Sequence, residues 1–332
     1  MNSACSRHLL AAVSAAVFGI MTNISAAELR IGMIGLDTSH VTVFTKQLND
    51  ATDKNHVPGG RVIAAFKGGS QDVESSRSRV EEYTKTLTEK FGVKLYDTIA
   101  ELCQNVDVVM IESVDGRPHL EQARPVLKAG KTLFIDKPLA GSLADAIAIY
   151  KLAKEAKVPV FSSSSLRYYP GLVELKSAAF GDLKGAFSTG PCSLESHHPD
   201  LYWYGVHATE ALYAIMGTGC ESVQRTTTAD TDVVTGVWSG GKVGTLRGIR
   251  NGSAPYRVTV FGSKAVLDQK PGGDYTPMLR EVVKFFQTGV SPVPLEETLE
   301  IFAFMEAADE SKRQDGRSVR LADVLKKNGW QP

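Results

Sequence analysis

The stretch that decides the fold is "AGKTLFIDKPLA", residues 129–140. Its centre, "TLFID" at 132–136, is an apolar run after a helical pattern that ends at Gly130, which is typical of a buried parallel strand. Lys137 follows this strand directly, between Asp136 and Pro138. A lysine there can donate to a substrate hydroxyl or carbonyl, and a neighbouring carboxylate can tune it. The X-Pro bond is a candidate for the cis form. An exposed loop lysine is the alternative.

Strand-like and helical patterns alternate on both sides of this stretch, from residue 29 to about 165. We expect strands at 29–34, 61–66, 106–113 and 158–164, and helices at 75–91, 119–129 and 142–156. Strands separated by helices predict an α/β domain with a doubly wound parallel sheet, a Rossmann arrangement. Ligands bind beyond the carboxyl ends of such strands, so residues 35–40, 112–119 and 136–138 should meet in one crevice.

The pattern changes after residue 165. Helical patterns at 172–179 and after residue 207 lead into strand-like runs with intervening glycines, and two helical patterns at 276–288 and 295–314 close the chain. We expect an α+β domain with an open, mostly antiparallel sheet over 166–332, whose last helices can pack back on the first domain (28–165). The strand-like runs are 231–239, 242–249, 256–262 and 264–269.

Residues 1–27 have the pattern of a secretory signal peptide. Arg7 gives a short basic start, residues 9–21 are apolar, and small residues precede Glu28. The apolar run is too short to span a bilayer comfortably. We therefore expect cleavage after Ala27 and a periplasmic or secreted protein with no membrane contact after cleavage. A retained N-terminal anchor is the alternative.

The composition excludes some partners and leaves the thiols open. Lys plus Arg and Asp plus Glu both total 37 in 332 residues, so the net charge argues against nucleic acid and anionic membranes as partners. The expected mature chain keeps Cys103, Cys192 and Cys220, without a C-x-x-C pair. A Cys192–Cys220 bridge and three buried thiols both stay open.

Several segments together resemble the Gfo/Idh/MocA oxidoreductase family. The family hallmark A-G-K-x-V-x-x-E-K-P is matched by "AGKTLFIDKP" at 129–138, with Asp136 in place of Glu. This resemblance implies a Rossmann domain followed by an α+β domain whose open sheet often forms oligomer contacts. We accordingly expect a homo-oligomer. Further matching segments, in the family's order, are "GRPHLEQARPVLKAGK" at 116–131, "SLRYYP" at 165–170, "FGDLKGAF" at 180–187 and "PLEETLEIFAFMEAADESKRQDGRSVRL" at 294–321.

The resemblance also implies catalytic and substrate-binding residues. Lys137 takes the place of the lysine that assists hydride transfer, and His207 in "LYWYGVH" takes that of the acid/base histidine. The family's Asp four residues before this histidine is Trp203 here, which removes one proton-transfer candidate. Trp203 and Tyr204 suit stacking on a sugar ring, although core packing is the alternative. The expected substrate-binding residues are Arg167, Trp203, Tyr204 and His207.

The cofactor half departs further from the family. The G-x-G-x-x-G motif of dinucleotide sites keeps only Gly35, with Asp37 and His40 at the other glycine positions. A carboxylate at 37 should repel a pyrophosphate. Lys67 stands where an acidic residue would bind the ribose, so it either favours NADP over NAD or is a solvated loop lysine. His119 should lie near the nicotinamide ribose. The expected cofactor-binding residues are Gly35, Leu36, Asp37, Thr38, Ser39, Lys67, Glu112, Ser113, His119, Asp136 and Lys137.

Thr38 and Ser39 can still cap the first helix and offer hydroxyl and N–H groups to a phosphate. We expect no metal, because the histidines lack the i, i+4 spacing that preorganises ligands. The alternative is a set drawn from four histidines and two acids: His40, His197, His198, His207, Asp37 and Asp200.

Three functions compete. The first is an exported NAD(P)-dependent oxidoreductase that acts on a sugar, cyclitol or glycoside with tightly held cofactor. The second is a carbohydrate-binding or scaffold protein that kept the fold and lost the dinucleotide. The third is a cofactor-independent lyase or hydrolase that uses Lys137 and His207.

Overall fold

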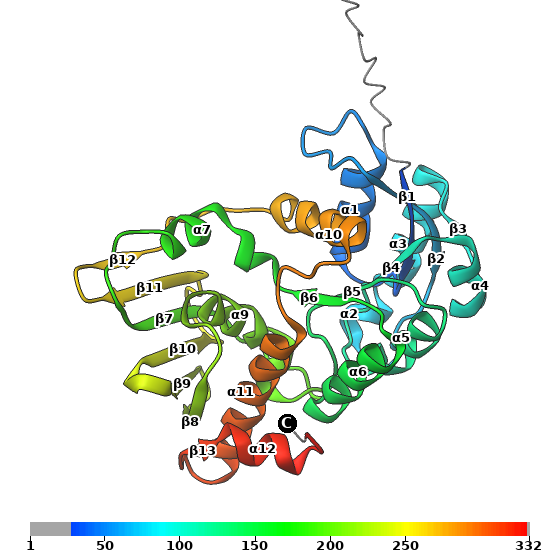
Figure 1. Cartoon of the computed structure of the whole chain (residues 1–332). Helices are drawn as coiled ribbons and strands as arrows, with labels where there is room; N and C mark the ends of the chain where they lie inside the picture. Colours follow the sequence, from blue (N-terminus) through cyan, green and yellow to red (C-terminus); the bar gives the residue numbers. More distant parts are fainter. Residues whose placement is uncertain (1–27, 331–332) are drawn as a thin grey trace, which may run out of the picture.

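The computed structural model describes residues 28–330, which form two sheets with helices packed around and between them (Figure 1). The expected signal peptide, residues 1–27, lies outside the described residues. None of the helices in the described part is long and apolar enough to cross a membrane.

The first sheet confirms the predicted doubly wound parallel arrangement. Its six strands pair in the order β3-β2-β1-β4-β5-β6, and each pair is parallel. This order reverses direction between β1 and β4, and ligands bind at such a switch point. The strands are β1 (Leu29–Ile34), β2 (Gly60–Phe66), β3 (Lys94–Leu95), β4 (Val108–Ile111), β5 (Leu133–Asp136) and β6 (Val160–Ser163).

Crossover helices connect these strands. Ser142 caps α6 (Leu143–Ala156) by accepting a 3.1 Å hydrogen bond from the Asp145 backbone N–H. The Lys137–Pro138 peptide bond is cis. The other crossover helices include α1 (Ser39–Asn49), α4 (Ile99–Asn105) and α5 (His119–Lys128).

The single helix expected at residues 75–91 is wrong in detail. The segment is broken into α2 (Glu74–Arg77), α3 (Val80–Lys85) and the π-helical turn η1 (Thr86–Lys90). Threonine hydroxyls compete for its backbone: Thr84 and Thr88 donate to the carbonyl oxygens of Val80 and Thr84. Such bonds loosen a helix, and apolar periodicity does not reveal them.

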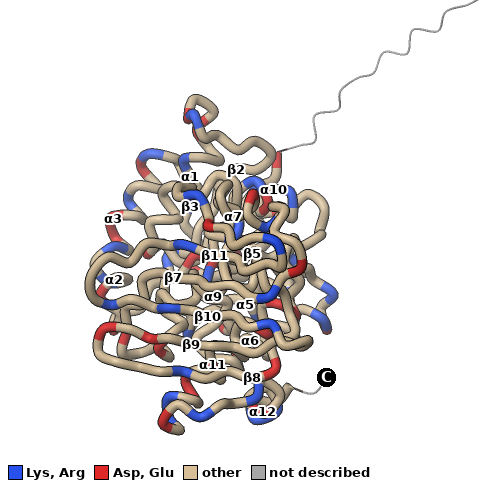
Figure 2. The backbone as a smooth tube through the Cα atoms, turned by 90° about the vertical axis from the view of Figure 1, so that its left-hand side faces the viewer, with Lys and Arg blue, Asp and Glu red and all other residues tan. Residues whose placement is uncertain are grey.

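The second sheet is open and mostly antiparallel, as predicted. Its order is β12-β11-β7-β10-β9-β8-β13, and only β7 and β10 pair in parallel (Figure 2). The strands expected from the sequence omit β7, β8 and β13, and in β8 the polar Glu221, Gln224 and Arg225 hide the alternation. The strands are β7 (Leu183–Pro191), β8 (Cys220–Thr227), β9 (Thr231–Trp238), β10 (Val243–Ile249), β11 (Arg257–Gly262), β12 (Val266–Asp268) and β13 (Val319–Arg320).

The helices of the second half pack on both sheets. Met278 and Val282 of α10 (Thr276–Thr288) share an apolar core with Ile31 of β1 and Phe44 of α1. The long helix α11 contacts both α6 and β8. The remaining elements are η2 (Ser165–Tyr168), α7 (Pro170–Lys176), α8 (Asp200–Trp203), α9 (Gly205–Met216), η3 (Ser239–Gly241), α11 (Leu295–Arg313) and α12 (Leu321–Lys327).

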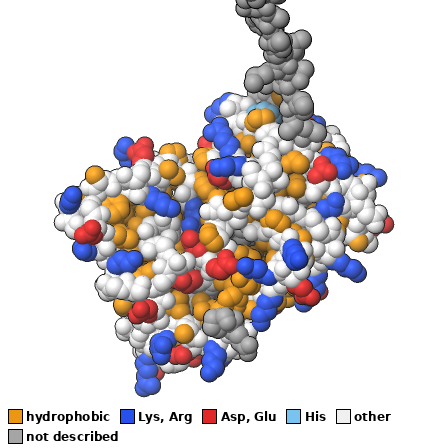
Figure 3. All heavy atoms as spheres, viewed as in Figure 1, with side chains coloured by type: hydrophobic (Ala, Val, Ile, Leu, Met, Phe, Trp, Pro, Cys, Tyr) orange, Lys and Arg blue, Asp and Glu red, His pale blue; other side chains and the backbone are white. Residues whose placement is uncertain are grey.

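The surface charges are mixed in sign, and the cysteines are not paired. Lysine, arginine and acidic side chains are interspersed over the face shown in Figure 3. Cys103, Cys192 and Cys220 are free and buried, so the structure has thiols where the sequence leaves a Cys192–Cys220 bridge open.

Candidate active site

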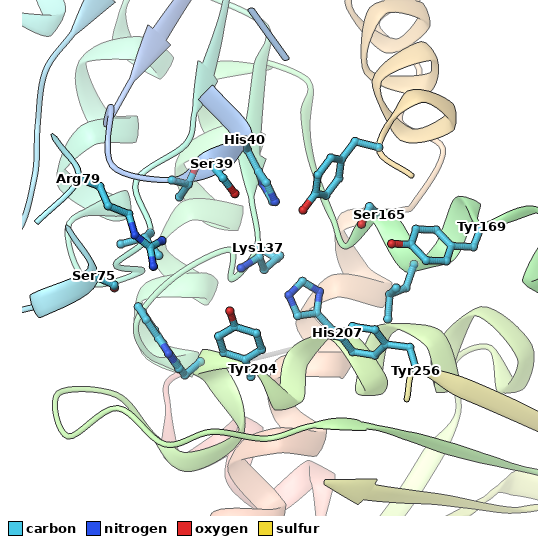
Figure 4. A pocket seen from close by; sticks show the side chains of 15 residues that line it. Ser39, His40, Ser75, Arg79, Lys137, Ser165, Tyr169, Tyr204, His207 and Tyr256 are labelled. Carbon is cyan, nitrogen blue, oxygen red and sulfur yellow. The ribbon is translucent and has the colours of Figure 1, made fainter. Parts of the chain in front are cut away.

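A cavity of about 280 Å³ lies at the carboxyl ends of the parallel strands, where α9 approaches the first sheet (Figure 4). This volume falls near the lower end of the range for small-molecule sites. The cavity brings together six of the residues predicted from sequence, which are Thr38, Ser39, Lys137, Trp203, Tyr204 and His207. Its other lining residues are His40, Ser75, Arg79, Val114, Ser165, Leu166, Tyr169, Tyr256 and Tyr275.

Lys137, just after β5, and His207, in α9, face the middle of this cavity (Figure 4). The His207 Nδ1 lies 2.8 Å from the Ser164 hydroxyl, which fixes the ring orientation. Burial lowers the pKa of His207 well below its ordinary value, and the charge of Lys137 lowers it further. His207 is therefore a neutral base at neutral pH, next to a fixed ammonium group.

Aromatic rings form much of the remaining wall. The Tyr204 and Tyr256 rings lie 5.9 and 5.7 Å from the His207 ring, and the Tyr204 centroid lies 5.9 Å from the Lys137 Nζ. Trp203 is only 9% exposed and packs on His198, with 4.9 Å between ring centroids. Rings with polar tips beside a base and an ammonium group suit a ligand with apolar faces and hydroxyl edges, such as a sugar or cyclitol.

The opposite end of the cavity suits an anion. The α1 helix begins here without a side-chain cap, so the positive end of its dipole faces the cavity wall. The Thr38 and Ser75 hydroxyls are buried without a hydrogen-bond partner in the described residues. Arg79 extends toward the same place (Figure 4). The predicted helix cap by the Thr38 hydroxyl is therefore wrong, and its free hydroxyl fits a phosphate of a dinucleotide instead.

The sequence predicts that the Asp37 carboxylate repels a pyrophosphate, but Asp37 does not line the cavity at this phosphate position. Its carboxylate is fully buried and accepts hydrogen bonds from the Ser76 hydroxyl at 2.6 Å and the Val114 backbone N–H at 2.8 Å. Burial raises the pKa of Asp37, and these two bonds offset part of that rise. Asp37 thus joins the segment after β2 to the segment after β4, and it is not one of the residues that line the cavity.

Lys67 lies in a separate depression with Gly68, Gly69 and Gln122. Its ammonium group forms a 2.5 Å ion pair with Glu81, and both side chains are largely exposed. Exposed pairs of this kind contribute little stability, so a phosphate can replace Glu81 at low cost.

Other predicted site residues support the cavity from behind. Gly35 has φ +83°, and a Cβ there would lie 2.0 Å from the Ser113 hydroxyl oxygen, so the turn after β1 requires glycine. Leu36 is a core residue with no exposure. The Ser113 hydroxyl is paired with Gln122, and the His119 ring bridges the carbonyl oxygens of Ser113 and Pro138.

Arg167 is not free to bind substrate in this structure. Its guanidinium is 8% exposed and forms ion pairs with Glu210 and Glu297, the latter at 2.6 Å. It joins η2 to α9 and α11 and so holds the cavity wall. Glu112 and Asp136 are also buried behind the cavity, at 0% and 1% exposure.

Sequence reasoning missed the cavity residues that come from distant segments. Ser75 and Arg79 precede α3, Tyr256 precedes β11, and Tyr275 lies just before α10. The run "YRVTVFG" contains Tyr256 but gives no sign that its first residue lines the cavity. The alternative histidine metal set does not assemble: His197 and His198 pair with Glu195, while His207 pairs with Ser164.

Comparison with known proteins agrees with the sheet and the lysine segment. Residues 29–164 match the family GFO_IDH_MocA, described as an oxidoreductase family with an NAD-binding Rossmann fold. This domain belongs to the Gfo/Idh/MocA oxidoreductase family.

Individual relatives share sequence with part of the chain or share its fold. A D-xylose 1-dehydrogenase (NADP(+)) of Hypocrea jecorina is 27% identical over 118 residues, which is 35% of this chain and 30% of that protein. The match thus spans about a third of the relative's length. Scyllo-inositol dehydrogenase from Lactobacillus casei has a TM-score of 0.73 at 15% identity, covering 89% of this chain and 98% of its own. Myo-inositol 2-dehydrogenase from Lactobacillus plantarum scores 0.72 at 15% identity, covering 88% and 99%. At these identities the structures show a shared fold.

Proposed function

We propose that this protein is an NAD(P)-dependent oxidoreductase that converts a CH–OH group of a sugar or cyclitol to a carbonyl group. The observation that carries the proposal is the facing pair Lys137 and His207, at the carboxyl edge of a sheet in an NAD-binding family. The named relatives with known substrates act on xylose and inositols, and this supports a polyhydroxylated substrate.

The residues divide the reaction between them. Neutral His207 accepts the proton of the substrate hydroxyl, while the Lys137 ammonium group stabilises negative charge on the same oxygen. A bound nicotinamide would supply the hydride acceptor. Thr38, Ser39, Ser75 and Arg79 hold the phosphates at the uncapped end of α1.

Lys67 favours NADP over NAD in this proposal, because its ammonium group can exchange Glu81 for a 2′-phosphate.

The signal-like residues 1–27 lead us to propose export to the periplasm or the medium, with a tightly held cofactor. The exposed Val237, Val243 and Phe261 on the second sheet lead us to propose a homo-oligomer. Light scattering of the purified protein tests the oligomer.

The deciding experiment separates the purified protein from its bound nucleotide. We expect denaturation to release close to one NADP(H) or NAD(H) per chain, or titration of the protein to show saturable binding. In Lys137→Ala the nucleotide should stay bound while oxidation of sugars and cyclitols is lost. If neither release nor binding is found, the oxidoreductase proposal fails and a carbohydrate-binding protein becomes the better account.

A further inference from the structure

The chain contains a second unusual cluster directly behind the cavity. It consists of His40 in the first turn of α1, Glu112 just after β4, and Asp136 at the end of β5. Their exposed fractions are 8%, 0% and 1%. His40 also lines the cavity, between the rings of Phe44 and Tyr275 at 5.1 and 4.6 Å. The cluster therefore borders the proposed reaction site.

Three of its oxygen atoms lack a hydrogen-bond partner in the described residues. They are both carboxylate oxygens of Glu112 and the Oδ1 of Asp136. A buried carboxylate without a donor is costly, and native structures seldom leave one unexplained. Burial raises the pKa of Glu112 well above its ordinary value, and the neighbouring Asp136 charge raises it further. The His40 ring is 4.0 Å from Glu112, and the Lys137 charge offsets only part of the rise, so no group in the described residues forms a hydrogen bond with this carboxyl.

A ring nitrogen of His40 and one carboxylate oxygen each from Glu112 and Asp136 lie within 4.8 Å of one another. The His40 Nδ1 is 2.6 Å from the Asp136 Oδ2 and 4.0 Å from the Glu112 Oε2. Small shifts would place all three groups around one ion at ordinary ligand distances. We propose that His40, Glu112 and Asp136 bind a divalent transition-metal ion.

The donor set indicates the class of metal. One imidazole and two carboxylates suit Zn²⁺ or Mn²⁺ better than Ca²⁺ or Mg²⁺, which prefer oxygen ligands alone. Three protein ligands leave coordination positions of the ion open. Because His40 lines the cavity, these open positions would lie at the cavity wall. The ion would thus be able to contact a substrate oxygen. His40 and Asp136 are also two positions at which this chain departs from its family's pattern, and they meet here.

The test is metal binding by the full chain after removal of metal with a chelator. We expect calorimetric titration with Zn²⁺ or Mn²⁺ to show close to one ion per chain, and Co²⁺ to give visible absorption bands of a nitrogen–oxygen site. Glu112→Gln and His40→Ala should each weaken binding by at least about tenfold. His56→Gln should leave it unchanged, because His56 contacts the Gln47 carbonyl oxygen far from the cluster.

Circular dichroism of each variant verifies its fold before titration. The proposal is overturned if wild-type protein binds none of the three ions. It is also overturned if Glu112→Gln binds them as tightly as wild type, which would indicate an adventitious ion elsewhere. Since the readout is ion binding, loss of the metal site and loss of dinucleotide binding are separately detectable.

Discussion

Two buried carboxylates three residues apart, Glu112 and Asp115, have opposite surroundings. Asp115 is 1% exposed and accepts a 2.6 Å bond from the Ser70 hydroxyl, pairs with Arg117 at 2.7 Å, and lies 3.0 Å from the His198 Nε2. Glu112 is equally buried and has no hydrogen-bond partner within the described residues. Although burial opposes it, these bonds hold the pKa of Asp115 well below its ordinary value, whereas the pKa of Glu112 is raised.

The difference separates structure from function at one strand end. The Asp115 cluster joins the segments after β2 and β4 to the loop before α8, so its charge holds these three segments together. Glu112 joins nothing, and its position behind the cavity gives it free ligand atoms. A carboxylate that costs stability and returns none is a sign of a binding role.

The largest effect should come from removing the satisfied carboxylate. Asp115→Ala removes one partner of the buried His198 and the acceptor of the Ser70 hydroxyl. We therefore expect a loss of about 3 kcal/mol in the free energy of unfolding. Urea denaturation of wild type and variant measures it. An effect near zero would mean that the cluster does not hold the loops.

Glu112→Gln should behave oppositely in metal-free protein. The change replaces a buried carboxyl group that has no hydrogen-bond partner by an amide of similar volume, so the free energy of unfolding should stay within about 1 kcal/mol of wild type or rise. The same urea titration on chelator-treated protein gives the value. A drop as large as that of Asp115→Ala would show that Glu112 has a strong partner and would remove the contrast.

The pH dependence of stability should distinguish the Asp115 cluster next. Burial lowers the pKa of His198, but Asp115 and Glu195 outweigh it and the pKa is raised. A raised pKa means that the charged pair stabilises the fold fully below the unfolded value of about 6.5, and that this contribution is lost as pH rises through the folded pKa. The stability difference between wild type and His198→Gln should therefore shrink on raising the pH above neutrality. A difference that grows would contradict the ion-pair interpretation.

The contrast between these acids also marks what sequence can reveal. Strand and helix periodicity predicts the parallel sheet, and the Asp136-Lys137-Pro138 segment places the lysine at its carboxyl edge. The sequence also offers Glu112 as a crevice residue, but it cannot show which carboxylate finds partners. That depends on Ser70, Arg117 and His198. Contacts over 45 and 83 positions in the chain are set by tertiary packing, which no local pattern encodes.

The smallest effect should come from the pair of Lys67 and Glu81, in which the carboxylate is exposed, whereas Asp115 in the Arg117–Asp115 pair is buried. Water screens the exposed charges, so Glu81→Gln should change the free energy of unfolding by no more than about 0.5 kcal/mol. The variant frees the Lys67 ammonium group, and its affinity for NADP should rise modestly while that for NAD stays constant. Titration with both nucleotides, with Glu89→Gln as the exposed control, measures this. Equal changes for NAD and NADP would show that Lys67 does not contact the 2′-phosphate. The exposure of the Lys67–Glu81 pair would then not indicate a ligand site, and its contrast with the buried Arg117–Asp115 pair would concern stability alone.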